Sequence, residues 1–122
     1  MRVQPAQAVG DAPSIGPETA LEALVQRMKT GDRTAVAEYL DQFGPYLRRR
    51  ARGRMGSGLR RMVDSLDMVA TVGRRLDQYV ANRRLQASTP PQFNALINRV
   101  MHAALVDKVR ALGRLRHAEP AS

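Results

Sequence analysis

The sequence predicts an all-α protein, folded as a compact bundle of about four helices. Apolar residues recur at intervals of three and four along most of the chain, which is the spacing of one face of an α-helix. Helix-capping residues stand just before these segments, and no alternating run of β-branched residues marks a strand. A chain of 122 residues is long enough for one domain with a modest core.

The first helix is expected to begin at Pro17, because proline suits the first helical position. Thr19 and Glu22 have the spacing of a capping box, and the Lys-Thr-Gly sequence at 29–31 is expected to end the helix. Residues 1–16 contain proline and glycine without an apolar period, so we expect a flexible leader there. The folded domain is then residues 17–116, and 117–122 are expected to form a flexible tail.

Asp32 is expected to cap a second helix, because five apolar residues follow it at helical spacing: Val36, Leu40, Phe43, Leu47 and Ala51. Pro45 stands inside this pattern and has no amide proton for the helix, so a kink or a short break is expected near Gly44. The Gly-Ser-Gly sequence at 56–58 is expected to be a turn.

A third helix is expected after Asp64, because this carboxylate and that of Asp67 complement the positive end of a helix. Its predicted buried stripe consists of Leu66, Val69, Val72, Leu76 and either Tyr79 or Val80.

The last helix has the clearest start in the chain. Thr89 is expected to cap it, Pro90 to fill its first position and Gln92 to complete a capping box. Its apolar positions run towards Arg116 and are Phe93, Leu96, Ile97, Val100, Ala104, Leu105, Val109 and Leu112.

Twenty basic residues against eleven acidic ones give a net charge of +9, which favours a polyanionic partner. Most of the basic residues are arginine, whose planar guanidinium suits phosphates and base edges. They gather in two places: Arg48, Arg49, Arg50, Arg52, Arg54, Arg60 and Arg61 in the first, and Arg99, Lys108, Arg110, Arg114 and Arg116 in the second. Solvated helix faces are the alternative explanation, but the unbalanced charge favours contact with nucleic acid.

Catalysis and cofactors have little support. The chain has no cysteine, which excludes a disulfide, a thiolate zinc site and a catalytic thiol. His102 and His117 have no neighbouring ligand set, so no metal site is expected. Helix capping by Asp64 and Asp67, and a surface ion pair of Asp77, explain the acidic residues. We therefore expect a cytoplasmic protein that is not an enzyme, has no cofactor and does not bind membranes.

Three segments, in order and at matching spacing, resemble a known family. The segment 28–32 followed by Tyr-Leu-Arg-Arg at 46–49 is similar to its opening helix pair. The segment Val-Asp-Ser-Leu-Asp-Met-Val at 63–69 is similar to its second motif. The segment 89–110, with Phe93, Leu105, Asp107 and Arg110, is similar to its last helix. About three quarters of the chain thus resembles region 2 of the extracytoplasmic-function sigma factors of bacterial RNA polymerase, without their C-terminal helix-turn-helix domain.

The resemblance implies an all-α module that binds core RNA polymerase and promoter DNA. The third helix would dock on the coiled coil of the largest polymerase subunit, through Asp64, Asp67, Met68, Thr71 and Arg75. The 86–89 loop and the last helix would hold the single-stranded −10 element, with flipped bases in a pocket and basic groups on the phosphates. Together with the charge clusters, the DNA-binding set is Arg48, Arg49, Arg52, Arg60, Arg61, Ser88, Thr89, Arg99, Lys108, Arg110 and Arg114.

Three positions depart from the family and leave alternatives open. Ala70-Thr71 replaces a Gln-Glu pair, Leu96 replaces a tryptophan, and Ala103 replaces an asparagine. One alternative is a stand-alone basic adaptor that binds nucleic-acid backbone without promoter specificity. Another is a protein-interaction module, for example for an anti-sigma or other regulatory protein, which would expose an apolar patch across Val69, Val72 and Leu76.

Overall fold

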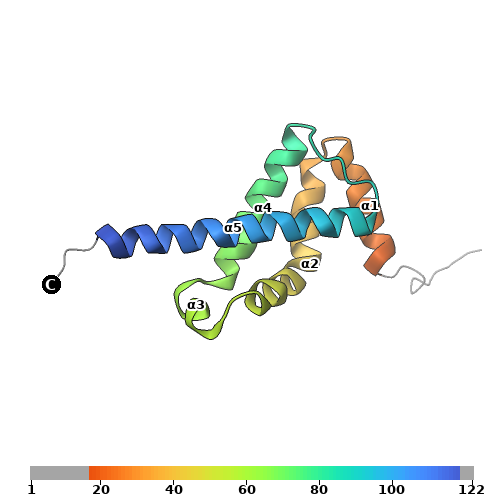
Figure 1. Ribbon diagram of the computed structural model, residues 1–122. Coiled ribbons are helices and arrows are strands. Elements are labelled where there is room, and N and C mark those ends of the chain that lie inside the picture. The colour runs from red at the N-terminus through yellow and green to blue at the C-terminus, as the bar shows by residue number, and fades with distance from the viewer. Residues whose placement is uncertain (1–16, 119–122) are drawn as a thin grey trace, which may run out of the picture.

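A computed structural model describes residues 17–118, which fold into an all-α bundle (Figure 1). These residues form five helices: α1 (Pro17–Lys29), α2 (Arg33–Gly53), α3 (Ser57–Met62), α4 (Ser65–Ala81) and α5 (Pro90–Ala118). The predicted fold class is therefore confirmed, with one short helix more than expected. The expected leader, 1–16, lies outside the described residues, as do residues 119–122 of the expected tail.

The predicted helix starts are largely confirmed, because each depends on contacts within a few residues. Asp32 accepts a hydrogen bond from the amide of Thr34 at 3.0 Å, and Asp64 accepts one from the amide of Leu66 at 2.9 Å. The predicted cap at Thr19 is wrong, since α1 already begins at Pro17 and Thr19 lies inside it.

Helix α2 continues through Pro45 as one helix from Arg33 to Gly53. The expected break is therefore absent from α2. Figure 1 shows the second half of α2 running at an angle to the first, which fits the expected kink at proline. The bend directs the arginine-rich half of α2 towards α3 and the start of α4, where Arg48 contacts Ser65 (Figure 1).

The Gly-Ser-Gly sequence at 56–58 is not a simple turn. It opens the six-residue helix α3, for which Gly56 is the N-cap without a side-chain hydrogen bond. Helices this short depend on tertiary contacts, and Leu59 supplies one by packing against the core. Local propensity alone therefore gave the wrong prediction.

Helix α4 is rotated relative to the predicted stripe. Val72, Leu76 and Val80 are fully buried as expected, but Met68 is also buried, whereas the Leu66 side chain is 56% exposed and Tyr79 is 37% exposed. The buried face is set by α2, the main packing partner of α4. At their closest point, a Cβ on Gly73 would lie only 2.6 Å from Leu40 Cδ1, so the absence of a side chain at Gly73 allows this approach.

Helix α5 crosses the bundle and extends beyond it (Figure 1). Its first half belongs to the core, where Phe93, Met101 and Ala104 are buried; towards its end, Val109 and Leu115 are 47% and 63% exposed. The helix continues through His117 and Ala118, two residues into the expected tail. Residues 17–118 contain no helix that is both long enough and apolar enough to cross a bilayer.

Candidate nucleic-acid interface

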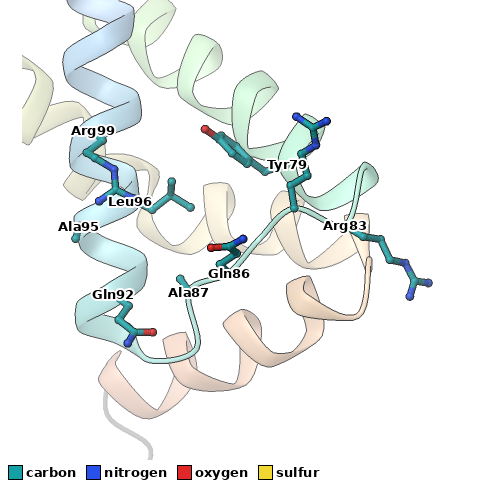
Figure 2. A pocket seen from close by; sticks show the side chains of 9 residues that line it. Tyr79, Arg83, Gln86, Ala87, Gln92, Ala95, Leu96 and Arg99 are labelled. Carbon is teal, nitrogen blue, oxygen red and sulfur yellow. The ribbon is translucent and has the colours of Figure 1, made fainter.

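A pocket of about 740 Å³ opens where α4 ends, beside the segment that leads to α5. Figure 2 shows Tyr79 from α4, Gln86 from the connecting segment and Leu96 from α5 around a common space. Nine residues line it: Tyr79, Arg83, Arg84, Gln86, Ala87, Gln92, Ala95, Leu96 and Arg99. It therefore combines one aromatic ring, small apolar side chains, two amides and three guanidinium groups.

The end of α4 determines one side of the pocket. The amide of Arg84 donates to the carbonyl of Tyr79 at 2.8 Å, and the amide of Arg83 donates to Val80 at 3.1 Å. These two backbone hydrogen bonds form a Schellman motif, in which the residue after the C-cap has a left-handed conformation. Arg83 has φ of 55°, in a position that glycine would occupy with less strain. Figure 2 shows its side chain running away from Tyr79, so Arg83 lies at the edge of the pocket.

The connecting segment is held by the core on one side and open on the other. Leu85 and Ala87 are buried, whereas Gln86 between them is exposed and lines the pocket. The Gln86 amide makes no hydrogen bond within residues 17–118, so it is free to read a ligand's polar edge. This alternation explains how a short segment presents one polar side chain at a fixed place.

The start of α5 forms the opposite side of the pocket. Thr89 Oγ1 accepts the amide of Gln92 at 3.3 Å, and Gln92 Oε1 accepts the amide of Ser88 at 2.9 Å. The predicted cap is thus confirmed, with the glutamine reaching one residue further back than in a standard capping box. Ser88 Oγ also accepts Lys29 Nζ at 2.6 Å. Ser88 and Thr89 therefore fix the loop, while their neighbours Gln86 and Ala87 line the pocket.

The predicted basic residues separate into three regions. Arg99 lines the 740 Å³ pocket. Arg48, Arg52, Arg60 and Arg61 line a second pocket, of about 400 Å³, at the other end of α4, while Arg49 lies on the neighbouring α2 surface. Lys108, Arg110 and Arg114 belong to the extended end of α5 and line neither pocket.

The polymerase-binding set needs a correction. Met68 is fully buried and Thr71 is only 8% exposed, so neither presents a side chain to a partner. Thr71 Oγ1 donates a hydrogen bond to the carbonyl of Asp67 and accepts one from Arg74, so its hydroxyl is already hydrogen-bonded within the fold. The rotation of α4 places Leu66 on the surface instead. Asp64 caps the helix, and Arg75 pairs with Asp107 at 2.7 Å.

The apolar patch expected for a protein-interaction module is also absent from the described surface, since Val72 and Leu76 belong to the core. A different apolar surface lies between α2 and α4. It is a groove of about 500 Å³ whose apolar lining is Leu40, Pro45, Leu66 and Val69.

Few of the cations are neutralised within the fold. Among the described side chains, Arg27, Arg33 and Arg75 have carboxylate partners within 4.0 Å. Hydrogen bonding from Arg33 lowers the pKa of Asp77. None of the arginines that line the two pockets has such a partner among these side chains, so both pockets present uncompensated positive charge.

Sequence reasoning missed five lining residues, namely Tyr79, Arg83, Arg84, Gln92 and Ala95. The Arg-Arg pair at 83–84, directly before the predicted 86–89 loop, was the available signal for that side of the pocket. Residues 17–118 contain no cluster of three or more histidine or acidic side chains able to hold a metal ion. No protein-family model, curated protein or solved structure matches the chain.

Proposed function

We propose that this chain binds single-stranded nucleic acid, with an unstacked base in the pocket between α4 and α5. The single observation that carries the proposal is the composition of that pocket: a half-exposed tyrosine ring beside an apolar floor, with guanidinium groups at its margin. A π-face stacks on any base, and arginines neutralise the adjoining phosphates. A duplex would keep its bases stacked and out of reach of Tyr79.

We further propose that the chain acts in transcription initiation, as a sigma region 2-like module on RNA polymerase core that holds the −10 element. The three motifs support this, and the pocket adjoins the segment that the resemblance assigns to the DNA. The α2–α4 groove, with Leu66 and Val69, offers an apolar surface of the kind that a helical partner buries.

Anisotropy titrations with a −10-like single strand test the base site. Stacking contributes about 1–3 kcal/mol per base, so Tyr79→Ala is expected to weaken binding about 5- to 150-fold. Tyr46→Ala is the matched control, because Tyr46 is exposed to the same extent, 38% against 37%, but lies outside this pocket. Equal losses from the two variants, or no loss from Tyr79→Ala, would refute the base site.

Retention on immobilised core polymerase tests the second part. Leu66→Arg is expected to abolish retention, whereas Leu115→Arg, at a similarly exposed leucine on α5, is expected to leave it unchanged. Failure of the unsubstituted chain to bind core polymerase contradicts the sigma-like role and leaves the single-strand site to be judged separately.

The second candidate is a stand-alone adaptor that binds only backbone, favoured by the uncompensated arginines of α2 and α3. It predicts similar affinity for single strands and duplex, and log K falling by about 0.9 per neutralised phosphate on duplex as log salt rises. Replacing Arg48, Arg49 and Arg52 together with alanine would then weaken binding and reduce that slope without changing helix content. Affinity independent of salt would exclude this function.

A further inference from the structure

The second pocket lies at the opposite end of α4 from the base site. It is formed where the last turns of α2, the short helix α3 and the first residues of α4 meet, and it measures about 400 Å³. Four of its lining residues are arginines: Arg48, Arg52, Arg60 and Arg61. Ser65 and Tyr79 are 14 residues apart on α4, so at 1.5 Å per residue the two pockets stand about 21 Å apart.

The positive charge in this pocket is only partly offset within the fold, because four arginines line it with one carboxylate. None of the four guanidinium groups has a carboxylate within 4.0 Å among the described side chains. That carboxylate, Asp64, accepts the amide of Leu66 and pairs with none of the four arginines, so the lining keeps an excess of positive charge. Arg48 and Arg52 are one helical turn apart, a spacing at which like charges repel. A bound anion would relieve this repulsion.

One of the four groups is fixed before any ligand binds. Arg48 Nε donates to Ser65 Oγ at 2.8 Å, and Ser65 is buried. This bond joins α2 to the start of α4 and holds the Arg48 guanidinium against the pocket wall. Arg60 and Arg61 come from α3, so charges from two helices converge on one small volume.

We propose that this pocket binds an oligophosphate, a chain of about three phosphates that is either free or attached to a nucleotide or to the 5′ end of a nucleic acid. Such a chain places several negative charges within one pocket, whereas a strand backbone supplies one charge per nucleotide spread along its length. Guanidinium groups bind phosphate oxygens in bidentate geometry, which suits a compact polyanion surrounded by four of them. This site is independent of the base site proposed above.

Isothermal titration of the full chain at constant ionic strength tests the site, with tripolyphosphate, orthophosphate and ATP as probes. We expect tripolyphosphate to bind at least about tenfold more tightly than orthophosphate, because it engages several guanidinium groups at once. Arg60→Gln and Arg61→Gln are each expected to weaken its binding about tenfold. Both side chains are exposed and make no hydrogen bond within residues 17–118, so the variants should fold, as circular dichroism can verify.

Arg114→Gln is the matched control, since it removes the same charge from an exposed position near the end of α5 that lines neither pocket. We expect it to change tripolyphosphate affinity by less than about twofold, and Tyr79→Ala to have no effect. Equal effects of Arg114→Gln and Arg60→Gln would overturn the proposal, because binding would then reflect net charge alone. Equal affinity for orthophosphate and tripolyphosphate would overturn it too.

Two further probes distinguish the sources of the phosphate chain. ATP binding as tightly as tripolyphosphate supports recognition of the chain alone. Tighter binding of a 5′-triphosphorylated oligoribonucleotide than of its 5′-hydroxyl counterpart, lost in Arg60→Gln, supports a nucleic-acid end as the ligand. A 5′-hydroxyl oligonucleotide that displaces tripolyphosphate as efficiently as the triphosphorylated one would overturn the proposal, since the pocket would then bind ordinary backbone.

Discussion

Phe93 provides a test of whether the start of α5 is a core anchor or a surface for stacking on bases. Its side chain is fully buried, and its ring meets that of Tyr39 edge to face with centroids 5.0 Å apart. Removing a buried phenylalanine side chain costs about 3–5 kcal/mol. An aromatic pair of this geometry adds about 0.5–1.5 kcal/mol beyond buried area, so we expect Phe93→Ala to fall at the upper end of that range.

Such a loss is a large part of the total stability of a small domain, which is about 5–15 kcal/mol. Urea unfolding followed by circular dichroism measures it as a shift of the midpoint at constant slope. Phe93→Leu keeps most of the volume and is expected to cost below about 1.5 kcal/mol. Because Phe93 is buried, the folded leucine variant should bind single strands normally. A Phe93→Ala loss under about 1 kcal/mol with an unchanged slope, or a Phe93→Leu variant that is stable but fails to bind, would refute the core assignment.

Three further predictions concern stability. A hydrogen bond from Arg27 lowers the pKa of Glu38 below its usual 4.5, so the ion pair stabilises the fold at neutral pH and this stabilisation is lost as the pH falls through the lowered value. The free energy of unfolding of Glu38→Gln should therefore decrease less on acidification, which urea titrations at stepped pH measure. Burial raises the pKa of Tyr39 above its usual 10.0, so the unfolded chain ionises first and stability should fall above that pH, but not in Tyr39→Phe. Gly113→Ala should stabilise the chain by about 0.5–1 kcal/mol, since nothing lies within 4 Å of a Cβ there. Gly73→Ala should not stabilise it, because the new methyl group would force a neighbouring leucine to move. Thermal melts of the two variants and the parent chain test both expectations.

The features that could be predicted from the sequence are those determined by short-range contacts. Asp32, Asp64 and Thr89 each bond to an amide two or three residues ahead, so the starts of three helices were visible in the residues alone. The rotation of α4 was not visible, because Leu66 and Met68 are both apolar and both belong to plausible helical stripes. The packing of α4 against α2 and α5 decides that Met68 is buried and Leu66 is exposed.

The candidate base site shows the same division. Its loop and Arg99 were predicted, because the loop lies between two recognisable helices and the charge is evident. Tyr79 was predicted to be a possible core residue, since its spacing from Leu76 fits the same face. Tyr79 is exposed because α4 directs the neighbouring Val80, which is fully buried, towards the core. Residue type did not indicate the left-handed conformation of Arg83 after the helix either.

Among the described side chains, the acidic residues compensate only part of the positive charge. The carboxylates of Asp32, Glu38 and Asp77 pair with Arg27 and Arg33 around α1 and the start of α2, and so neutralise those two guanidinium groups. The uncompensated guanidinium groups of the two pockets remain at opposite ends of α4. Screening acts over about 8 Å at physiological ionic strength, and the pockets are about 21 Å apart, so each attracts anions as a separate site. A strand bound at one pocket therefore leaves the charge of the other pocket unneutralised unless it also reaches across the length of α4.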